Sequence, residues 1–472
     1  MPAAQRRAVV IGSGPNGLAA AIALAQAGLQ VDVYEAEPQP GGAARTLPLT
    51  LPGFLHDFGS AVHPMALASP FFSTLPLHDY GLEWIQPSAP LAHPLDDGTA
   101  VILERDLSAA EAALGEDGKQ WRRLFGSFAA HWTELAPEIL RPVSLFPRHP
   151  LLLAHLGLVG FPSATAAARF WFHNPRTKAL FAGLAAHSML SLDEPLTSAF
   201  AIIFAATAHA VGWPIPRGGA KSITTALCGY LASLGGKVHV STRVENLASA
   251  GQYDVALCDV TPRQLLGIAG DRLTTSYKRQ LEKYRYGPGV FKVDYALSEP
   301  IPWKTAGCRR AATAHLGGTI EEIAVSEDAM RHGRIAERPF VLLAQPSLFD
   351  PTRAPAGRHV AWAYCHVPNG CEVDMLPRIE AQIERFAPGF RDCVLERRIF
   401  SPASLEAMDA NLIGGDIGGG AADLRQFLFR PTRKYYATSA KDIYICSSST
   451  PPGGGVHGMC GYNAAKMALK RL

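Results

Sequence analysis

Three glycines near the N-terminus have the spacing that lets a protein backbone hold a phosphate. Gly12, Gly14 and Gly17 follow an apolar, β-branched run at 8–11 and open a stretch at 15–27 that is rich in Ala and Leu. In a strand–turn–helix unit, the first glycine permits the tight turn, the second lets the backbone approach a pyrophosphate, and the third lets the helix pack closely on the sheet. The pattern therefore predicts a dinucleotide-binding unit.

An acidic residue stands where such a unit binds a ribose. Glu35 ends a second predicted strand at 31–34. A carboxylate at this place accepts hydrogen bonds from ribose hydroxyls and repels a 2′-phosphate, so an unphosphorylated adenosine ribose is expected. These residues alone leave NAD and FAD open.

A second glycine pair favours FAD. Gly41 and Gly42 are followed by Arg45, whose side chain is long enough to reach the same pyrophosphate. A fingerprint, an acid and then G-G-x-x-R is similar to the arrangement in FAD oxidoreductases of the glutathione-reductase-like and amine-oxidase-like groups. FAD is therefore the predicted cofactor.

The next segment carries a family resemblance. Gly59 and Ser60 are small enough to let the backbone approach a flat ring system such as an isoalloxazine, and His63 follows them. The stretch GGAARTLPLTLPGFLHDFGSAVHP resembles the phytoene desaturase-related flavoproteins, a group with carotenoid desaturases, carotenoid isomerases and retinol saturase. Within that group the sequence most resembles the branch of an animal protein with a pyridine-nucleotide-disulfide-oxidoreductase domain.

The resemblance implies that distant segments complete one FAD site. In relatives a P-x-G-G turn introduces a helix and a strand beside the flavin, and Val244 lies where the turn after that strand contacts the adenine. The hairpin that usually follows this strand in the family is missing here. Near the C-terminus, P-G-G-G-V and G-Y-N-A-A match relatives position by position. Many relatives have a histidine where this sequence has Pro451, and His457 follows the glycines instead.

The predicted site residues come from these segments. Those predicted to bind FAD are Gly12, Gly14, Pro15, Asn16, Gly17, Glu35, Ala36, Gly42, Ala43, Arg45, Gly59, Ser60, Val244, Gly454, Gly455, Val456, Gly458 and Asn463. The candidate catalytic residues are His63, Arg217 and His457. Each has an ordinary alternative, because most histidines are structural and an arginine in a turn often only faces solvent. No metal site is predicted.

Composition argues against several other functions. The 472 residues carry a formal charge of only +3, which argues against nucleic-acid binding and provides no polybasic membrane tether. The eight cysteines are scattered without a C-x-x-C pair, so reduced thiols in a cytoplasmic protein are expected rather than disulfides or zinc ligands. Because the first strand begins by residue 8, no signal peptide is expected. The oligomeric state stays unknown.

Two apolar runs bear on membrane contact. The run at 196–213 has no charged residue, but its Thr, Ser and His content favours a buried helix, or one lining a tunnel for an apolar ligand, over a membrane span. The run at 151–161 is too short to span and fits either a core helix or a patch that rests on a membrane surface. Peripheral membrane contact therefore stays open.

The expected fold is an α/β protein with a discontinuous Rossmann-type FAD-binding domain, like those of glutathione reductase and amine oxidases, and an inserted α+β substrate domain. The FAD-binding domain is predicted at 1–95, 214–290 and 430–472. The substrate domain, a helical insert plus a mixed sheet, is predicted at 96–213 and 291–429.

These features lead to one expected function and two alternatives. The first is a phytoene dehydrogenase-like, FAD-dependent oxidoreductase that transfers a hydride between a hydrophobic substrate, of isoprenoid or polyene type, and flavin N5. It would act as a desaturase, saturase or isomerase. The second is an amine oxidase-like flavoenzyme, which would show a lysine near the flavin and an aromatic cage. The third is a flavin-binding interaction protein without turnover.

Overall fold

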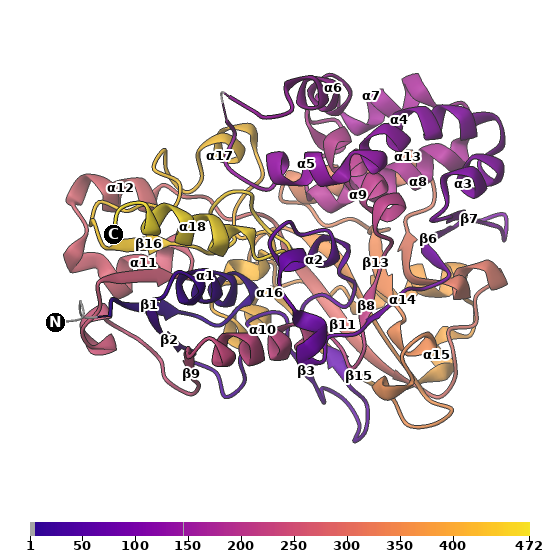
Figure 1. Cartoon of the computed structure of the whole chain (residues 1–472). Coiled ribbons are helices and arrows are strands. Elements are labelled where there is room, and N and C mark those ends of the chain that lie inside the picture. Colours follow the sequence, from indigo (N-terminus) through magenta and orange to yellow (C-terminus); the bar gives the residue numbers. More distant parts are fainter. Residues whose placement is uncertain (1–4, 145) are drawn as a thin grey trace.

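The N-terminal strand lies at the centre of a parallel five-stranded sheet. A computed structural model describes residues 5–144 and 146–472, and the order in its smaller sheet is β16-β10-β1-β2-β9 (Figure 1). All neighbouring strands run parallel. The strands are β1 Arg7–Ile11, β2 Gln30–Tyr34, β9 Lys237–His239, β10 Val255–Cys258 and β16 Ile443–Ile445.

Helices cover both faces of this sheet, as its two-sided apolar strands require. One face packs against α1 (Pro15–Gln26), α10 (Lys221–Ser233) and α18 (Met459–Leu469). The other packs against α11 (Pro262–Ala269) and α12 (Thr275–Glu282). The sheet is therefore a Rossmann-like layer whose elements come from distant parts of the chain.

The last helix packs on the first at very short range. Gly461 of α18 faces the backbone of α1, where a Cβ would lie only 1.7 Å from the carbonyl oxygen of Asn16. No side chain fits at such a distance, so this contact requires glycine.

A larger mixed sheet has the order β15-β11-β14-β13-β12-β6-β7, antiparallel except where β12 pairs with β6. Its strands are β6 Ala89–Pro94, β7 Ala100–Leu103, β11 Gly289–Leu297, β12 Ala311–Leu316, β13 Val341–Ala344, β14 His359–Val367 and β15 Val394–Phe400. One face packs against α14 (Leu376–Phe386) and α15 (Phe390–Cys393). The opposite face turns toward the helical insert.

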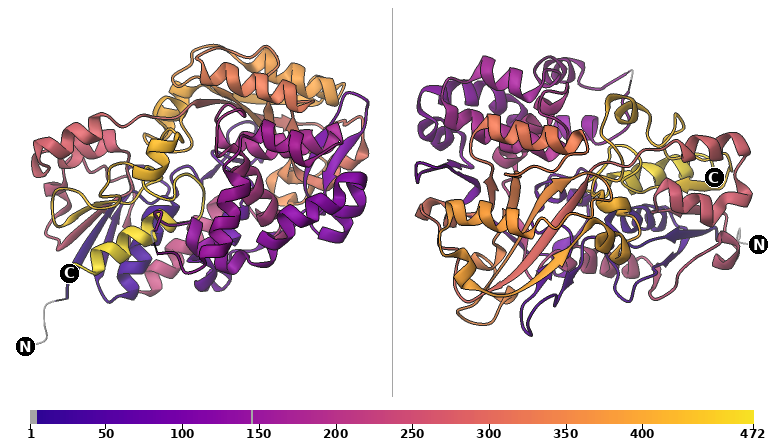
Figure 2. Two further views of the ribbon diagram at one scale, coloured as in Figure 1. Left: turned by 90° about the horizontal axis from the view of Figure 1, so that it is seen from above. Right: turned by 180° about the vertical axis from the view of Figure 1, so that it is seen from behind.

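The insert is a helical layer, coloured purple to magenta in Figure 2. Its helices are α3 Leu107–Ala113, α4 Gly118–Ala130, α5 Trp132–Ile139, α6 Pro150–Gly160, α7 Ala164–Trp171, α8 Pro175–Ala185 and α9 Thr197–Ala210. α13 (Ile320–Arg331) packs against α8. Within the described residues no single helix is long and apolar enough to cross a membrane, although α6 and α7 together, bent by 93°, pass that test of length and composition.

Short elements complete the chain. They are β3 Thr46–Leu47, β4 His56–Asp57, β5 Trp84–Ile85, β8 Ile215–Pro216, α2 Pro64–Leu67, α16 Pro402–Met408 and α17 Leu424–Phe429.

The predicted fold class is confirmed, because a Rossmann-like sheet and a mixed sheet are both present and the first is built from separated segments. The run at 196–213 forms α9, which is mostly buried in the interior. β6 belongs to the larger sheet, although the boundary predicted at residue 95 assigns it to the FAD-binding domain. The sequence of β6 has the apolar pattern of a buried strand in either sheet. Its pairing with β12 in the structure shows that it belongs to the larger sheet.

Candidate functional site

A cavity of about 570 Å³ runs from the glycine loop to the larger sheet. At one end it is lined by the loop after β1, the end of β2 and the loop that carries Arg45. At the other it is lined by α9 and by strands β11, β12, β13 and β14. We call these the dinucleotide end and the chamber.

The glycine loop has the backbone geometry that the sequence predicted. Gly12 has a φ of +95°, and its N–H donates to the carbonyl of Tyr34 at 2.8 Å. A Cβ on Gly17 would lie 2.1 Å from the carbonyl oxygen of Gly12, so only glycine lets α1 begin so close to the turn. The loop lies at the start of α1, where free N–H groups and the helix dipole attract an anion.

Glu35 lies at the end of β2 and lines the cavity. Its Oε2 accepts hydrogen bonds from the backbone N–H of Ser13 at 3.0 Å and from the Ser13 hydroxyl at 2.6 Å, and its Oε1 accepts from the N–H of Glu37 at 2.9 Å. These bonds fix the carboxylate beside the glycine loop. Because two carboxylate oxygens offer about four acceptor positions, capacity remains for a ribose hydroxyl.

Arg45 is buried and lines the cavity, but its donors are engaged with the protein. Its Nε donates to the carbonyl of Gly42 and its Nη2 to that of Met408, both at 2.7 Å, and Nη1 lies 3.5 Å from Glu37. The side chain therefore holds the second glycine pair against the C-terminal end of α16. The geometry supports a positioning role more than the direct pyrophosphate contact expected from the sequence.

Two carboxyl groups lie beside the glycine loop, Asp259, which is buried, and Asp409, which is partly buried. Oδ2 of Asp259 accepts from the N–H of Gly17 at 2.8 Å. Burial raises the pKa of Asp259 to about 7, and the nearby charges of Asp409 and Glu35 add to the rise. Burial also raises the pKa of Asp409. A neutral Asp259 repels a bound pyrophosphate less than a carboxylate would.

The dinucleotide end fits the phosphates of a dinucleotide. A Cβ on Gly14 would lie 2.9 Å from Oδ2 of Asp259, and one on Gly42 would lie 3.3 Å from the Cα of Gly14. Within the described residues, the buried Oδ1 of Asn16 has no hydrogen-bond partner. Bare backbone and an unpaired polar atom thus face the same space.

The chamber has apolar and aromatic walls with polar groups set among them. Its apolar residues include Met65, Met189, Phe200, Phe204, Trp213 and Leu342. Lys292, Trp362, Tyr364 and His366 line it from β11 and β14. Burial lowers the pKa of the Lys292 ammonium, which is paired with Asp294.

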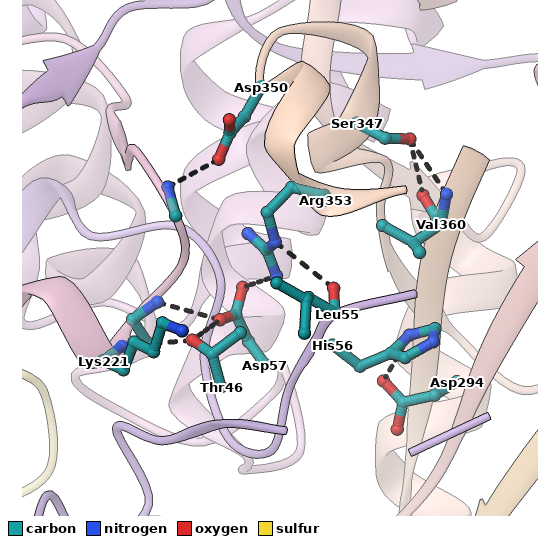
Figure 3. A network of polar contacts seen from close by, with 12 residues as sticks. Thr46, Leu55, His56, Asp57, Lys221, Asp294, Ser347, Asp350, Arg353 and Val360 are labelled. Carbon is teal, nitrogen blue, oxygen red and sulfur yellow. Dashed lines mark hydrogen bonds and ion pairs between the residues drawn. The ribbon is translucent and has the colours of Figure 1, made fainter. Parts of the chain in front are cut away.

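A buried polar network holds the segment just before Gly59 and Ser60, which line the cavity (Figure 3). Asp57 accepts from Nη2 of Arg353 at 2.7 Å, from the Thr46 hydroxyl at 2.8 Å and from the N–H of Ala220 at 2.8 Å. Burial alone would raise the pKa of Asp57, but the Arg353 charge and these hydrogen bonds lower it below its ordinary value. Asp350 accepts from the N–H of Gly218 at 2.7 Å. The network fixes the segment before Gly59 to the P-x-G-G turn and to the larger sheet.

Most predicted site residues share this cavity. Those that line it are Gly12, Gly14, Pro15, Asn16, Glu35, Ala36, Gly42, Ala43, Arg45, Gly59, Ser60, His63, Val244, Gly454, Gly455 and Val456. Both ring nitrogens of the buried His63 have no partner among residues 5–144 and 146–472, and burial lowers its pKa to about 4, which keeps the ring neutral.

Five predicted residues lie outside the lining. Gly17 and Gly458 serve close packing instead, since a Cβ on Gly458 would lie 2.4 Å from the Phe72 ring. Asn463 donates to the carbonyl of Leu140 at 3.0 Å.

The other two are candidate catalytic residues. Nδ1 of His457 accepts from the N–H of Met459 at 3.0 Å at the start of α18. The half-exposed side chain of Arg217 pairs with Glu83 at 2.7 Å and faces away from the cavity. Neither has the geometry of a catalytic residue in this site.

Sequence reasoning missed the polar residues of the chamber. Trp362, Tyr364 and His366 alternate with small or apolar residues along β14. Such a period of two places all three on one face of the sheet. That alternation could have shown that the three side chains share one face of the strand. It does not show that this face lines a cavity.

The comparisons with known proteins extend this picture. Residues 10–74 match the family model described as an NAD(P)-binding Rossmann-like domain. The chain is 26% identical to mouse pyridine nucleotide-disulfide oxidoreductase domain-containing protein 2, over 98% of this chain and 93% of that protein. It is 24% identical to the lycopene-forming phytoene desaturase of Pseudescherichia vulneris, over 98% of this chain and 99% of that one.

The resemblance to phytoene desaturase-related proteins is confirmed. Among solved structures, putrescine oxidase bound to putrescine is similar, with a TM-score of 0.60 and 19% identity over 99% of this chain and all of that one. This similarity shows a shared fold. Together with the relatives it indicates an oxidoreductase built on a dinucleotide-binding scaffold.

Proposed function

We propose that this protein is an FAD-dependent oxidoreductase that transfers a hydride between a hydrophobic substrate and the N5 atom of its flavin. One observation carries the proposal: a single cavity joins a backbone-lined dinucleotide end to an apolar chamber. The names of the relatives favour a desaturase with an isoprenoid or polyene substrate. A saturase or an isomerase would use the same arrangement.

The residues of the dinucleotide end would hold the cofactor. The glycine loop would face the pyrophosphate and Glu35 the ribose, while Gly59 and Ser60 give the backbone room beside a flat ring. When bound, FAD supplies a two-electron acceptor or donor. The walls of the chamber orient an apolar substrate and exclude water from it.

The test is to add FAD to the purified protein and record its absorbance near ~450 nm, a property of the flavin. Anaerobic mixing with a library of polyenes and other apolar compounds should then bleach that band. A protein that never becomes yellow contradicts the proposal. A bound flavin that only dithionite reduces supports the interaction protein without turnover.

Amine oxidation is a second candidate, favoured by two features of the chamber. The buried Lys292 lines the cavity, with its Nζ 5.7 Å from the Trp362 ring centroid. Trp362 and Tyr364 stack with their centroids 5.4 Å apart. This alternative requires a lysine near the flavin and an aromatic cage, and Lys292 beside these stacked rings supports it. Bleaching by putrescine or cyclohexylamine, with no response to apolar compounds, would favour it.

We also propose that the protein is cytoplasmic and touches a membrane through α6, α7 and the segment before them. Four large apolar side chains there are strongly exposed: Phe146 (89%), Leu151 (85%), Leu158 (76%) and Phe170 (84%). Exposed aromatic and aliphatic side chains of this kind insert into the interface of a bilayer. In the part of the chain that the structure describes, the eight cysteines are unpaired, in keeping with a reducing compartment.

Co-sedimentation with phospholipid vesicles tests this contact. The double variant Leu151→Glu and Phe170→Glu should stay in the supernatant and keep FAD. The matched control is Leu395→Glu on β15, where the side chain is 44% exposed and lies outside the patch. Equal sedimentation of all three proteins would contradict the contact.

A further inference from the structure

One face of β14 presents polar ring atoms to the chamber. Trp362, Tyr364 and His366 alternate along the strand and all line the cavity, while the residues between them pack into the core on the opposite face. Within the described parts of the chain, the buried Nε1 of Trp362 and Nε2 of His366 have no hydrogen-bond partner. A chamber built only for a hydrocarbon would have no use for these atoms.

Glu327 fixes the orientation of the His366 ring. Its Oε2 lies 2.7 Å from Nδ1 of His366, and both side chains are buried. Nδ1 therefore carries a proton and donates it to the carboxylate, which leaves Nε2 for another partner. The neighbouring His187 differs, because its Nε2 already pairs with Nε2 of His315 at 3.1 Å.

Keeping a carboxylate and an imidazole buried here is costly for the fold. A buried ion pair often contributes less stability than apolar residues of the same size. Glu327 is fully buried on α13 and holds the His366 ring through Nδ1. This cost is offset when a ligand satisfies Nε2, since an unsatisfied buried polar atom is destabilising.

The surroundings determine which ligand fits. Phe204 and Trp213 pack beside His187, and Phe340 lies 6.3 Å from His366, ring centroid to centroid. Burial and the Glu327 charge raise the pKa of Tyr364, so its hydroxyl remains protonated. A hydroxyl on a ligand pairs with Nε2 whether that atom donates or accepts, because a hydroxyl does both.

We propose that the substrate is an apolar molecule that carries an oxygen function, an alcohol or its carbonyl counterpart, and that His366, oriented by Glu327, binds that oxygen. The proposal rests on the proposed function and narrows its substrate from hydrocarbon polyenes to oxygenated apolar compounds. His366 binds the ligand, and Glu327 is a positioning residue.

Binding of matched ligands to the purified full chain with added FAD tests this. The probes are geraniol, its aldehyde geranial and the hydrocarbon that lacks the oxygen, and the readouts are titration calorimetry and the ligand-induced shift in Tm. Geraniol should bind about tenfold more tightly than the hydrocarbon, as expected for one buried hydrogen bond. His366→Leu should remove that preference without weakening the binding of the hydrocarbon. His366→Asn should restore part of the preference.

A matched control is His332→Leu, the same change at an exposed histidine next to α13; it should keep the preference. Glu327→Leu should reduce the preference for geraniol while the hydrocarbon still binds. Equal binding of the three probes to the unaltered protein, or no binding of geraniol, overturns the inference. The calorimetric and Tm readouts measure ligand binding and need no turnover. A failure of this inference can therefore be told apart from a failure of the proposed function, which would show as FAD that does not bind or is not bleached.

Discussion

The two ends of the cavity are built by different means. The dinucleotide end consists mostly of backbone: Gly12, Gly14 and Gly42 bring bare main chain together, and Glu35 is held by neighbours within two dozen residues. The chamber is lined mainly by side chains, among them those of α9 and of four strands of the larger sheet, β11, β12, β13 and β14. Backbone recognition suits a phosphate that many proteins bind, whereas side-chain recognition can change with the substrate while the scaffold stays the same.

The strongest test of this contrast is Gly17→Ala. Its Cβ would have to move away from the carbonyl oxygen of Gly12, only 2.1 Å distant, and would displace the loop. We expect loss of bound FAD after gel filtration and about 3 kcal/mol of lost stability, as for severe overpacking.

Gly267→Ala on α11 is the matched control, because its added Cβ meets no atom within 4 Å. It should keep FAD and gain about 0.5–1 kcal/mol from the better helix former. If both variants bind FAD equally, the loop is not the cofactor site.

Arg353→Leu should disrupt the buried polar network around Asp57. Removing the guanidinium leaves the Asp57 carboxylate buried and unpaired, which costs about 3–5 kcal/mol. Urea unfolding measures this loss, and adding Asp57→Asn should recover part of it.

The same pair has a predictable pH dependence. The pKa of Asp57 is lower in the folded state than its ordinary value of 3.8. The ionised carboxylate therefore contributes to the free energy of unfolding above pH 3.8, and this contribution is lost as the pH falls through the folded pKa. An Arg353→Leu protein that melts like the unaltered protein would show that the network is not structural.

Asp259→Asn sharpens the comparison at the dinucleotide end. The pKa of Asp259 is about 7 in the folded protein against 3.8 ordinarily, so folding is unaffected by ionisation below about pH 4. Between about pH 4 and pH 7 the free energy of unfolding then falls as the pH rises. The total loss is at most about 4 kcal/mol.

Asparagine keeps an acceptor for the N–H of Gly17 and cannot ionise. The variant should therefore match the unaltered protein near pH 4 and melt at a higher temperature at pH 8. If the Tm of the variant differed from that of the unaltered protein by the same amount at both pH values, the result would contradict a buried Asp259 that titrates.

The smallest effect is expected for Arg217→Ala. The side chain is half-exposed and its partner Glu83 is also exposed, so solvent screens their interaction. Neither FAD content, Tm nor the rate of flavin bleaching should change measurably. A clear loss of bleaching with FAD still bound would restore Arg217 as a catalytic candidate.

The sequence predicted the dinucleotide end well because its signals are local. Glycine spacing, an apolar strand and one acidic residue lie within the first 35 residues, and the backbone geometry follows from glycine itself. The family resemblance placed the C-terminal glycines in the same cavity, but not the directions of His457 or Asn463, since a matching segment does not fix where each side chain points.

The chamber escaped prediction for a different reason. Glu327 and His366 lie on a helix and a strand that are adjacent only in the folded protein. Lys292 and Asp294 lie two residues apart, so a strand places both side chains on one face, but nothing near them in sequence indicates Trp362 as a neighbour. Such pairs follow from strand order, which periodicity does not give.

The contact between Gly461 and Asn16 has a consequence for synthesis. The glycine loop leaves the ribosome long before β16 and α18, which pack on its sheet and its helix. The glycine loop therefore stays without part of its cavity lining until the segment at 447–456 has been made. A ribosome stalled shortly before residue 440 would carry a chain whose dinucleotide end is incomplete.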